Sequence, residues 1–423
     1  MNPLPIVIAA LLRNRFTALL FIGVIALAVG LGVAISAQER ALRLGSARAA
    51  NRFDLIVAAP GSQTDVLLSV VYLDPTAVEL LSPEMTATVL AGERAEFAAP
   101  IGFGDSQGGD PVVGTTAQFV GHLSDELAEG RVFDAMNEAV VGALSLHAIG
   151  EAIEITHGNT DGPGGGDADK ASDHHEEGSE ADHEQHDEAE HHHQPVTVVG
   201  RMRPTGTPWD RAIIVPIEYN WSVHGLETGH ARGDKRVGPP FDTAKLPGVP
   251  AIVIKPENLA AAYGLRDRYR TVASTAFFPA EVLVDLYTVM GNVARVMSGL
   301  TLAAQVLVVA AILAGILALL DLQRQRFAVL RALGAPRAFI FATVWLYVVI
   351  LIASGALVGL LLGWAFARLV SGIVSAETGM AMQATLGGTE FALVGALLLL
   401  GLLLAVIPAA LIYRRPVIEA LRA

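Results

Sequence analysis

The chain has 423 residues, 52% of them hydrophobic, and its 29 Lys and Arg against 42 Asp and Glu give a formal net charge of −13. The apolar residues are concentrated in blocks, which is typical of a membrane protein and not of a soluble one. The absence of cysteine excludes a disulfide scaffold, a thiolate metal site and a cysteine nucleophile.

The N-terminal region is apolar over residues 3–12 and then basic at residues 13–15, before a second apolar run. Residues 1–15 end in Arg13 and Arg15, and we expect them to lie at the membrane interface. The uncharged run 16–38 is long enough for a helix to cross about 30 Å of hydrocarbon. The alternative is a cleaved signal peptide, but this run exceeds the roughly 7 to 15 residues of a signal core. We therefore predict a first transmembrane helix at 16–38.

Residues 39–290 are predicted to form a large domain between the first and second spans. Short stretches rich in β-branched residues predict its strands, and helices are predicted at 75–81, 120–127 and 259–269. The predicted strands are 53–62, 112–116, 139–142, 153–156, 196–200, 212–216 and 251–254. Together they indicate an α+β domain that is large enough for its own core and for two subdomains.

An acidic, histidine-rich tract, residues 158–194, interrupts this domain. It holds twelve acidic residues and seven histidines with almost no apolar residues, so we expect it to be disordered at the tip of a β-hairpin. Imidazole and carboxylate groups are good ligands for zinc and other transition metals, so the tract predicts metal binding. The alternative is a merely solvated acidic loop. The candidate ligands are His174, His175, His183, His186, His191, His192 and His193, with His157 at the border.

Three further uncharged runs, 296–320, 338–367 and 391–413, are each long enough to span the membrane. No Asp, Glu, Lys, Arg or His lies inside any of the four spans, which argues against a self-contained ion or proton pump. Small residues at every fourth position let helices approach closely in lipid, either within one protomer or between two. These residues are Ala26, Gly30 and Ala34 in the first span and Gly355, Gly359 and Gly363 in the third.

A short basic segment, residues 321–337, joins the second and third spans. An excess of Arg in a short loop marks the cytoplasmic face of the membrane. Apolar residues at helical spacing, followed by Gly334 and Pro336, predict a short amphipathic helix there. Its candidate coupling residues are Arg324, Arg326, Phe327, Leu330, Arg331, Leu333 and Gly334. The alternative is an ordinary positively charged cytoplasmic loop.

Charge is divided unevenly along the chain. Residues 38–290 carry 18 Lys and Arg against 38 Asp and Glu, whereas the short flanks and the tail 414–423 are basic. By the bias of positive charge toward the cytoplasm, both termini are inside and the large domain is outside. The predicted fold class is thus an α-helical membrane protein with four transmembrane helices and a large α+β extracytoplasmic domain between the first two.

The segment Leu-Arg-Ala-Leu-Gly-Ala at 330–335 resembles the cytoplasmic coupling helix of FtsX-like and MacB-like ABC transporter permeases. Arg326 stands where that family usually has an acidic residue. Four segments of the large domain resemble one branch of the same permeases, so that the resemblance covers nearly the whole chain, while the histidine-rich tract lies outside it. These segments are 53–62, 130–143, 204–216 and 278–283.

The resemblance implies a permease subunit in the bacterial inner membrane that forms a homodimer with two copies of a cytoplasmic ABC ATPase. ATP-driven motion would then pass through the amphipathic helix to the external domain. The chain has no phosphate-binding loop of its own, so we expect no enzyme activity in it. We expect a role in zinc handling, with a periplasmic metal-binding or accessory protein and no nucleic acid as partner. The alternatives are lipid or lipoprotein extraction, a scaffold that activates a periplasmic hydrolase, and a metal sensor without a transporter.

Overall fold

The structure is a computed structural model of the chain. It describes residues 2–157, 195–289 and 334–406, together with the separate helical positions 291, 296, 299, 303, 306, 310 and 314. The chain divides into two compact units. Unit 1 contains residues 1–46, 286–377 and 381–423, and unit 2 contains residues 47–285 and 378–380.

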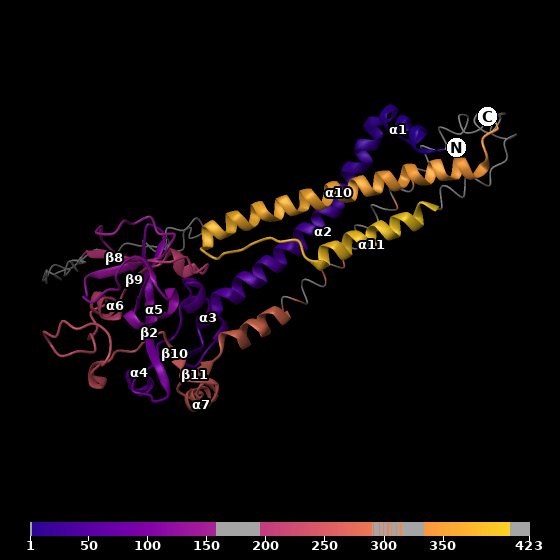
Figure 1. Ribbon diagram of the computed structural model, residues 1–423. Coiled ribbons are helices and arrows are strands. Elements are labelled where there is room, and N and C mark those ends of the chain that lie inside the picture. Colours follow the sequence, from indigo (N-terminus) through magenta and orange to yellow (C-terminus); the bar gives the residue numbers. More distant parts are fainter. Residues whose placement is uncertain are drawn as a thin grey trace, which may run out of the picture. The chain divides into compact units, whose positions relative to one another are not determined.

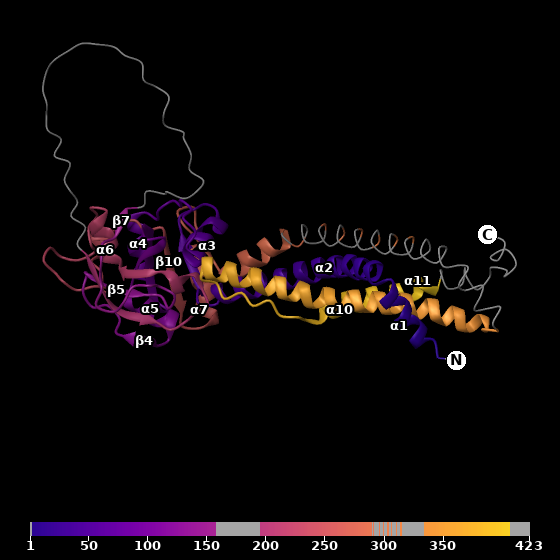
Figure 2. The same ribbon diagram turned by 90° about the horizontal axis from the view of Figure 1, so that it is seen from above.

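Unit 1 is helical, and its helices α2, α10 and α11 run along one another, with the short α1 at an angle to them (Figures 1 and 2). They are α1 (Leu4–Arg13), α2 (Arg15–Ala50, whose last four residues belong to unit 2), α10 (Arg337–Thr378) and α11 (Gly388–Leu404). By length and composition, α2 and α10 can each cross a membrane, and α11 is a shorter apolar helix. The second predicted span, 296–320, lies almost entirely outside the described residues, and the fourth is described only to residue 406. Four transmembrane helices therefore remain a prediction.

The interior of unit 1 is a layer of branched aliphatic side chains. Val29 and Val33 of α2 pack with Val348 and Ala356 of α10, and with Leu397 of α11. The opposite faces of these helices expose large apolar side chains instead of polar ones. They include Leu27, Leu31, Leu361, Phe366 and Leu399. A soluble protein rarely exposes so much contiguous apolar surface, which fits helices that are solvated by lipid.

Two helices of unit 1 are longer than the sequence predicts. α2 continues past residue 38 to Ala50, because residues 39–50 are good helix formers supported by an i,i+4 ion pair between Glu39 and Arg43. The predicted span 16–38 thus lies within a longer helix. α10 likewise continues past residue 367, where the third predicted span ends, to Thr378. Gly379, with φ of +73°, ends it in the left-handed conformation that glycine favours.

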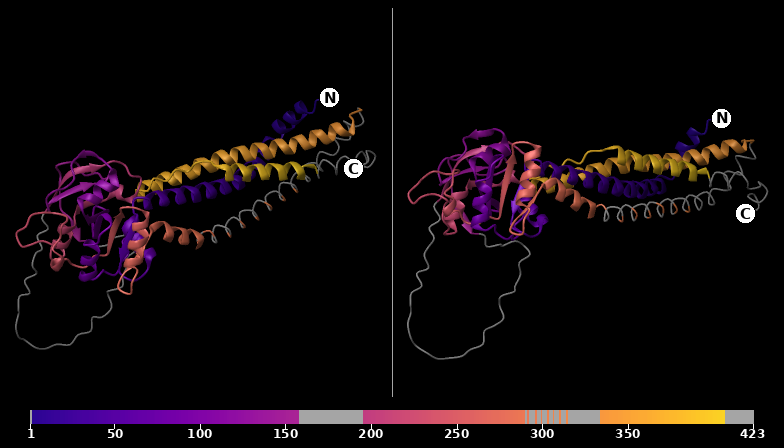
Figure 3. Two further views of the ribbon diagram at one scale, coloured as in Figure 1. Left: turned by 60° about the horizontal axis from the view of Figure 1, so that its bottom comes forward. Right: turned by 90° about the horizontal axis from the view of Figure 1, so that it is seen from below.

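Unit 2 is an α+β domain built on an 11-stranded mixed sheet (Figure 3). Along the main path the strand order is β11-β1-β10-β2-β3-β9-β5-β8-β4, while β6 pairs with β8 and β7 with β2. The strands are β1 (Leu55–Ala58), β2 (Ala95–Gln107), β3 (Asp110–Thr115), β4 (Leu127–Gly130), β5 (Glu138–Val141), β6 (Ala152–Ile153), β7 (Thr156–His157), β8 (Val196–Met202), β9 (Ile213–Pro216), β10 (Ala251–Pro256) and β11 (Thr275–Phe277).

Helices cover both faces of the part of the sheet near β1, β10 and β2. They are α3 (Gln63–Tyr72), α4 (Pro83–Leu90), α5 (Ala117–Ser124), α6 (Ile217–Val223) and α7 (Leu259–Tyr269), with short 3₁₀ turns at η1 (Pro208–Arg211) and η2 (Thr243–Lys245). Neighbouring residues of a strand point to opposite faces, and Phe97 of β2 accordingly packs against Phe119 of α5 while Ala98 packs into the core under α4 and α7. A further helical stretch covers residues 279–289.

β2 connects the two halves of the sheet. Its first part pairs with β10 and its second part with β3, and the register shifts between Phe103 and Asp105 at Gly104, whose φ is +137°. One core cluster surrounds Ile252 and Trp221, and a second surrounds Val198 and Ile213. The α+β prediction and its two subdomains therefore correspond to two cores on one continuous sheet.

The local predictions within unit 2 succeeded unequally. The predicted helix 259–269 coincides with α7, but the helix predicted at 75–81 was wrong. Helices flank that stretch instead, because the hydroxyls of Ser62 and Ser82 accept hydrogen bonds from the backbone N–H groups three residues later and start α3 and α4 there. β2, β4 and β11 were not predicted. In β2, the longest of the three, Pro100 and Gly104 interrupt the pattern of a strand.

The histidine-rich tract is flanked by paired strands, as predicted. Ile153 of β6 lies opposite Val196 of β8 in an antiparallel pair. The next strand, β7, leaves this hairpin and pairs with β2, so that His157 lies opposite Asp105. The hairpin prediction thus holds for its base, and residues 156–157 join a different strand.

Candidate functional site

A seam of small residues joins α2 and α10 in unit 1. An added Cβ at Gly355 would lie 2.6 Å from Ile25 Cβ, and one at Gly359 would lie 2.7 Å from the carbonyl oxygen of Ala26. At Gly363 it would meet the backbone of Gly30. Any side chain larger than hydrogen would force the two backbones apart. In this chain the predicted glycine stripe therefore contacts the small-residue stripe of the same protomer's first span.

An ion pair closes the end of this bundle where α11 begins. Arg40 Nη2 donates to both carboxylate oxygens of Glu390, at 2.5 and 2.6 Å. Arg40 Nη1 donates to the Thr385 carbonyl oxygen at 3.0 Å. The backbone N–H of Gly387 donates to Glu390 Oε2 at 2.8 Å. The Glu390 side chain is fully buried and that of Arg40 is 25% exposed. A buried carboxylate that loses such partners is strongly destabilised, so the pair fixes α2 to α11.

The glycine seam joins α2 to α10, and the Arg40–Glu390 pair joins α2 to α11. The pair was missed in the sequence because Arg40 and Glu390 stand 350 positions apart. The available signal was a lone acid, Glu390, directly before the last uncharged run.

Of the predicted coupling segment 321–337, the structure describes only residues 334–337. Residues 324, 326, 327, 330, 331 and 333 lie outside it. Gly334 has φ of +95°, the left-handed region that suits a helix end, and α10 begins at Arg337. The coupling role of this segment stays a prediction.

The predicted metal ligands also fall mostly outside the described residues. His174, His175, His183, His186, His191, His192 and His193 belong to the undescribed stretch 158–194. His157 is described only through its backbone, in β7 opposite Asp105. Within the described ranges, no group of three or more His, Asp or Glu residues is arranged to hold a metal ion. The metal prediction therefore rests on the sequence.

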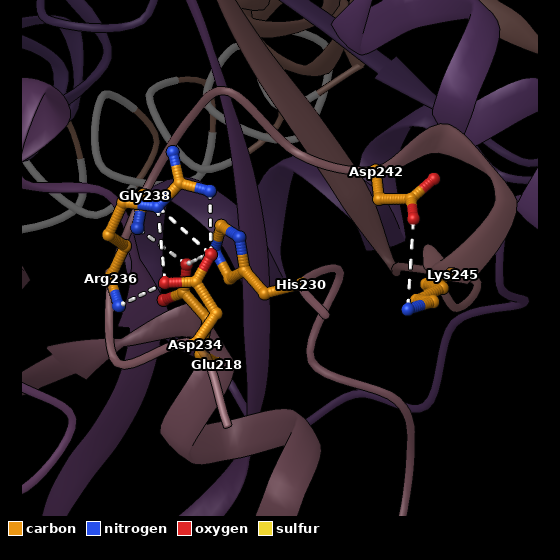
Figure 4. Close-up of polar contacts among 7 residues, drawn as sticks. All are labelled: Glu218, His230, Asp234, Arg236, Gly238, Asp242 and Lys245. Carbon is orange, nitrogen blue, oxygen red and sulfur yellow. Dashed lines mark hydrogen bonds and ion pairs between the residues drawn. The ribbon is translucent and has the colours of Figure 1, made fainter. Parts of the chain in front are cut away.

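A buried carboxylate anchors a long loop of unit 2 (Figure 4). Glu218 in α6 is 1% exposed, and its Oε1 lies 3.2 Å from His230 Nε2 and accepts a hydrogen bond from the Gly238 N–H at 2.5 Å. Burial raises the pKa of the Glu218 carboxyl, although its hydrogen bonds oppose that rise. Both ends of the segment 230–238 are thus attached to one side chain, which sequence patterns did not indicate.

The exposed tip of that loop has its own ion pair. Asp234 accepts two bonds from Arg236 Nε, at 3.1 and 3.0 Å, and one from Nη2 at 2.6 Å. The hydrogen bonds from Arg236 lower the pKa of the Asp234 carboxyl to about 2. Farther along, Lys245 Nζ lies 3.8 Å from Asp242 Oδ2 (Figure 4). These exposed pairs shape the loop and offer no catalytic constellation.

Comparison with known proteins bears on unit 1. Residues 298–417 match the family model of the FtsX-like permease C-terminal domain. The periplasmic region of MacB from Actinobacillus actinomycetemcomitans aligns with 57% of this chain and 95% of its own length, at 9% identity and a TM-score of 0.32. No curated protein matches the chain. The C-terminal part of the chain, residues 298–417, is therefore similar to the C-terminal domain of FtsX-like permeases.

Proposed function

We propose that this chain is the membrane subunit of an ATP-driven machine in the inner membrane, in which two copies work with two copies of a separate cytoplasmic ATPase. The observation that carries the proposal is the match of residues 298–417 to the FtsX-like permease domain. That match includes the predicted cytoplasmic segment 321–337, which has the basic and amphipathic character of a docking helix.

The mechanism we propose is transmission of motion and not conduction through the spans. The four predicted spans contain no Asp, Glu, Lys, Arg or His that could relay a proton or coordinate an ion. The close contact between α2 and α10 leaves no room for a side chain at Gly355 or Gly359, which favours helices that shift as a group. ATP binding would move the segment 321–337, and the helices would carry that movement to unit 2.

Zinc handling is the finer part of the proposal. Seven histidines and twelve acids in residues 158–194 give an external tract that attracts cations and offers nitrogen ligands at neutral pH. Many equivalent ligands favour modest affinity and more than one ion per tract. Lipid or lipoprotein extraction, and activation of a periplasmic hydrolase, use the same ATP-driven motion without metal.

The proposal is tested by purifying the tagged full chain from its own membranes in mild detergent. We expect a P-loop ATPase to copurify at equal stoichiometry and to hydrolyse ATP. Leu330→Asp places an unpaired charge on the predicted docking face and should remove that ATPase while membrane insertion is kept. Leu357→Asn is a suitable insertion control, because Leu357 is an exposed residue of α10. A pure chain with no ATPase, or one that keeps its ATPase after Leu330→Asp, would contradict the proposal.

A further inference from the structure

The loop 230–238 of unit 2 carries a charge opposite to that of the domain around it. Outside the histidine-rich tract, residues 38–290 hold 17 Lys and Arg against 26 Asp and Glu, whereas this loop holds three basic residues against one acidic residue. The basic residues are Arg232, Lys235 and Arg236, and all three are exposed. We call residues 230–238 the basic loop.

The base of the basic loop is fixed to the core of unit 2. The buried carboxylate of Glu218 contacts both ends of the loop, at the His230 ring and at the Gly238 N–H (Figure 4). The His230 ring also lies 5.4 Å from the ring of Phe241, which packs edge-on against Trp221 of the core. Because its ends are held in this way, the loop presents its charges with little left to order when a ligand binds.

Two of the three cations are available to a ligand. Arg236 is held by Asp234 through the hydrogen bonds described above. Arg232 and Lys235, in contrast, make no ion pair with any residue in the described part of the chain. Between them, no atom lies within 4 Å of a Cβ position at Gly233, whose φ is +85°. The tip of the basic loop is therefore an open, positively charged surface that attracts anionic groups.

The histidine-rich tract leaves the domain near the basic loop. The residue before the tract, His157, lies opposite Asp105 in the β2–β7 pair. Asp105 Oδ2 is 3.6 Å from His224 Nε2, and His224 is the C-cap of α6, from which the chain runs directly into the basic loop. Ten residues of extended chain span about 33 Å. The tract, residues 158–194, is thus long enough to reach the basic loop from its point of exit.

We propose that the histidine-rich tract docks on the basic loop when it holds no zinc, and that zinc bound by the tract releases it. The tract has twelve acidic residues against one Lys, so it supplies the carboxylates that Arg232 and Lys235 lack. Zinc takes carboxylate and imidazole ligands and adds two positive charges, so it competes with the loop for the tract. The release by zinc deepens the proposed zinc handling and rests on it, whereas the docking of the zinc-free tract does not.

Pulsed electron paramagnetic resonance on the full chain tests both parts of this proposal. One spin label is placed at Ser179→Cys in the tract and the other at Ala231→Cys, an exposed position of the basic loop, in a chain without native cysteine. The labelled chain is diluted into unlabelled chain, so that only distances within one protomer are measured.

Two charge variants are compared with the parent in this doubly labelled background. Arg232→Gln/Lys235→Gln removes the two available charges of the basic loop. Arg268→Gln/Arg270→Gln is the matched control, because it removes two exposed charges at the end of α7 and leaves the loop unchanged.

In chelator, the parent and the control should give the same narrow distance distribution. Arg232→Gln/Lys235→Gln should widen it at least about twofold, because an undocked chain of the 22 residues from His157 to Ser179 samples distances of about 26 Å from its attachment. Zinc should widen the distribution of the parent to that of the charge variant. Equal distributions in the parent and the charge variant without zinc would overturn the docking and leave the basic loop to an external anionic partner.

Calorimetry with zinc on the same samples separates this proposal from the proposed function. If zinc binds to the parent and the narrow distribution persists, the release by zinc is wrong. If the parent binds no zinc, the proposed zinc handling fails, while the comparison of the parent with the charge variant in chelator still decides whether the tract docks.

Discussion

Replacement of Arg40 by Met should destabilise unit 1 far more than an exposed charge would suggest. The Glu390 side chain is fully buried, and Arg40 supplies two of its contacts, so Arg40→Met leaves a carboxylate that retains the Gly387 N–H. Breaking one side of a buried ion pair costs about 3–5 kcal/mol. The Thr385 carbonyl also loses its donor from Arg40.

The double variant separates the pair from the individual residues. Arg40→Met/Glu390→Met removes both charges and leaves an apolar contact, which for a buried pair costs little, about 0–2 kcal/mol. The loss in the double variant should therefore be smaller than in Arg40→Met alone. Glu39→Gln is the matched control, because it breaks the exposed Glu39–Arg43 pair on the same helix and should cost no more than about 1 kcal/mol.

The free energy of unfolding can be measured in mixed detergent micelles by titration with sodium dodecyl sulfate, with helical circular dichroism as the signal. A double-mutant cycle then gives the interaction energy of Arg40 with Glu390. Additive losses, with the double variant as damaged as the sum of the two single variants, would refute the claim that the buried pair holds α2 to α11.

Three further outcomes follow from the same structure. Gly363→Val should separate α2 from α10 and lower the free energy of unfolding by more than about 1 kcal/mol. Gly372→Val should be nearly neutral, because no atom lies within 4 Å of an added Cβ there, and equal losses in the two variants would contradict the seam. The hydrogen bond to Asp105 raises the pKa of His224, so the contribution of this pair to stability should be full below about pH 6.5 and be lost as the pH rises through the raised pKa. The free energies of unfolding of the parent and of His224→Gln, measured by denaturant titration, should therefore differ at low pH and converge at high pH. Deletion of residues 161–194 should remove most zinc binding in calorimetry of the full chain without changing its melting temperature, and undiminished binding would exclude the tract as the zinc site.

Hydropathy and helix-forming patterns predicted much of this molecule. The first and third spans, α7 and most central strands follow from runs of apolar or β-branched residues, whose burial is a local property of the sequence. α2 and α10 extend beyond the predicted spans, because hydropathy marks the apolar part of a helix and not its polar extension. β2 was missed because Pro100 and Gly104 interrupt its pattern.

The contacts that join separate elements of the structure are made between residues far apart in the sequence. Arg40 reaches Glu390 and Glu218 holds Gly238, and neither of these pairs leaves a periodic trace in the sequence. The glycine stripe was different, since its spacing alone indicated close packing. Only the structure could show that its partner is the first span of the same chain.

In the proposed machine, ATP hydrolysis by a separate subunit moves the external domain. Pulsed electron paramagnetic resonance tests it directly, with one spin label on Val272→Cys, where the native side chain is 98% exposed, in the assembled dimer with its ATPase. We predict that the distance distribution between the two labels shifts when the complex passes from the nucleotide-free state to the vanadate-trapped state. An identical distribution in both states, in a complex that hydrolyses ATP, would contradict the account.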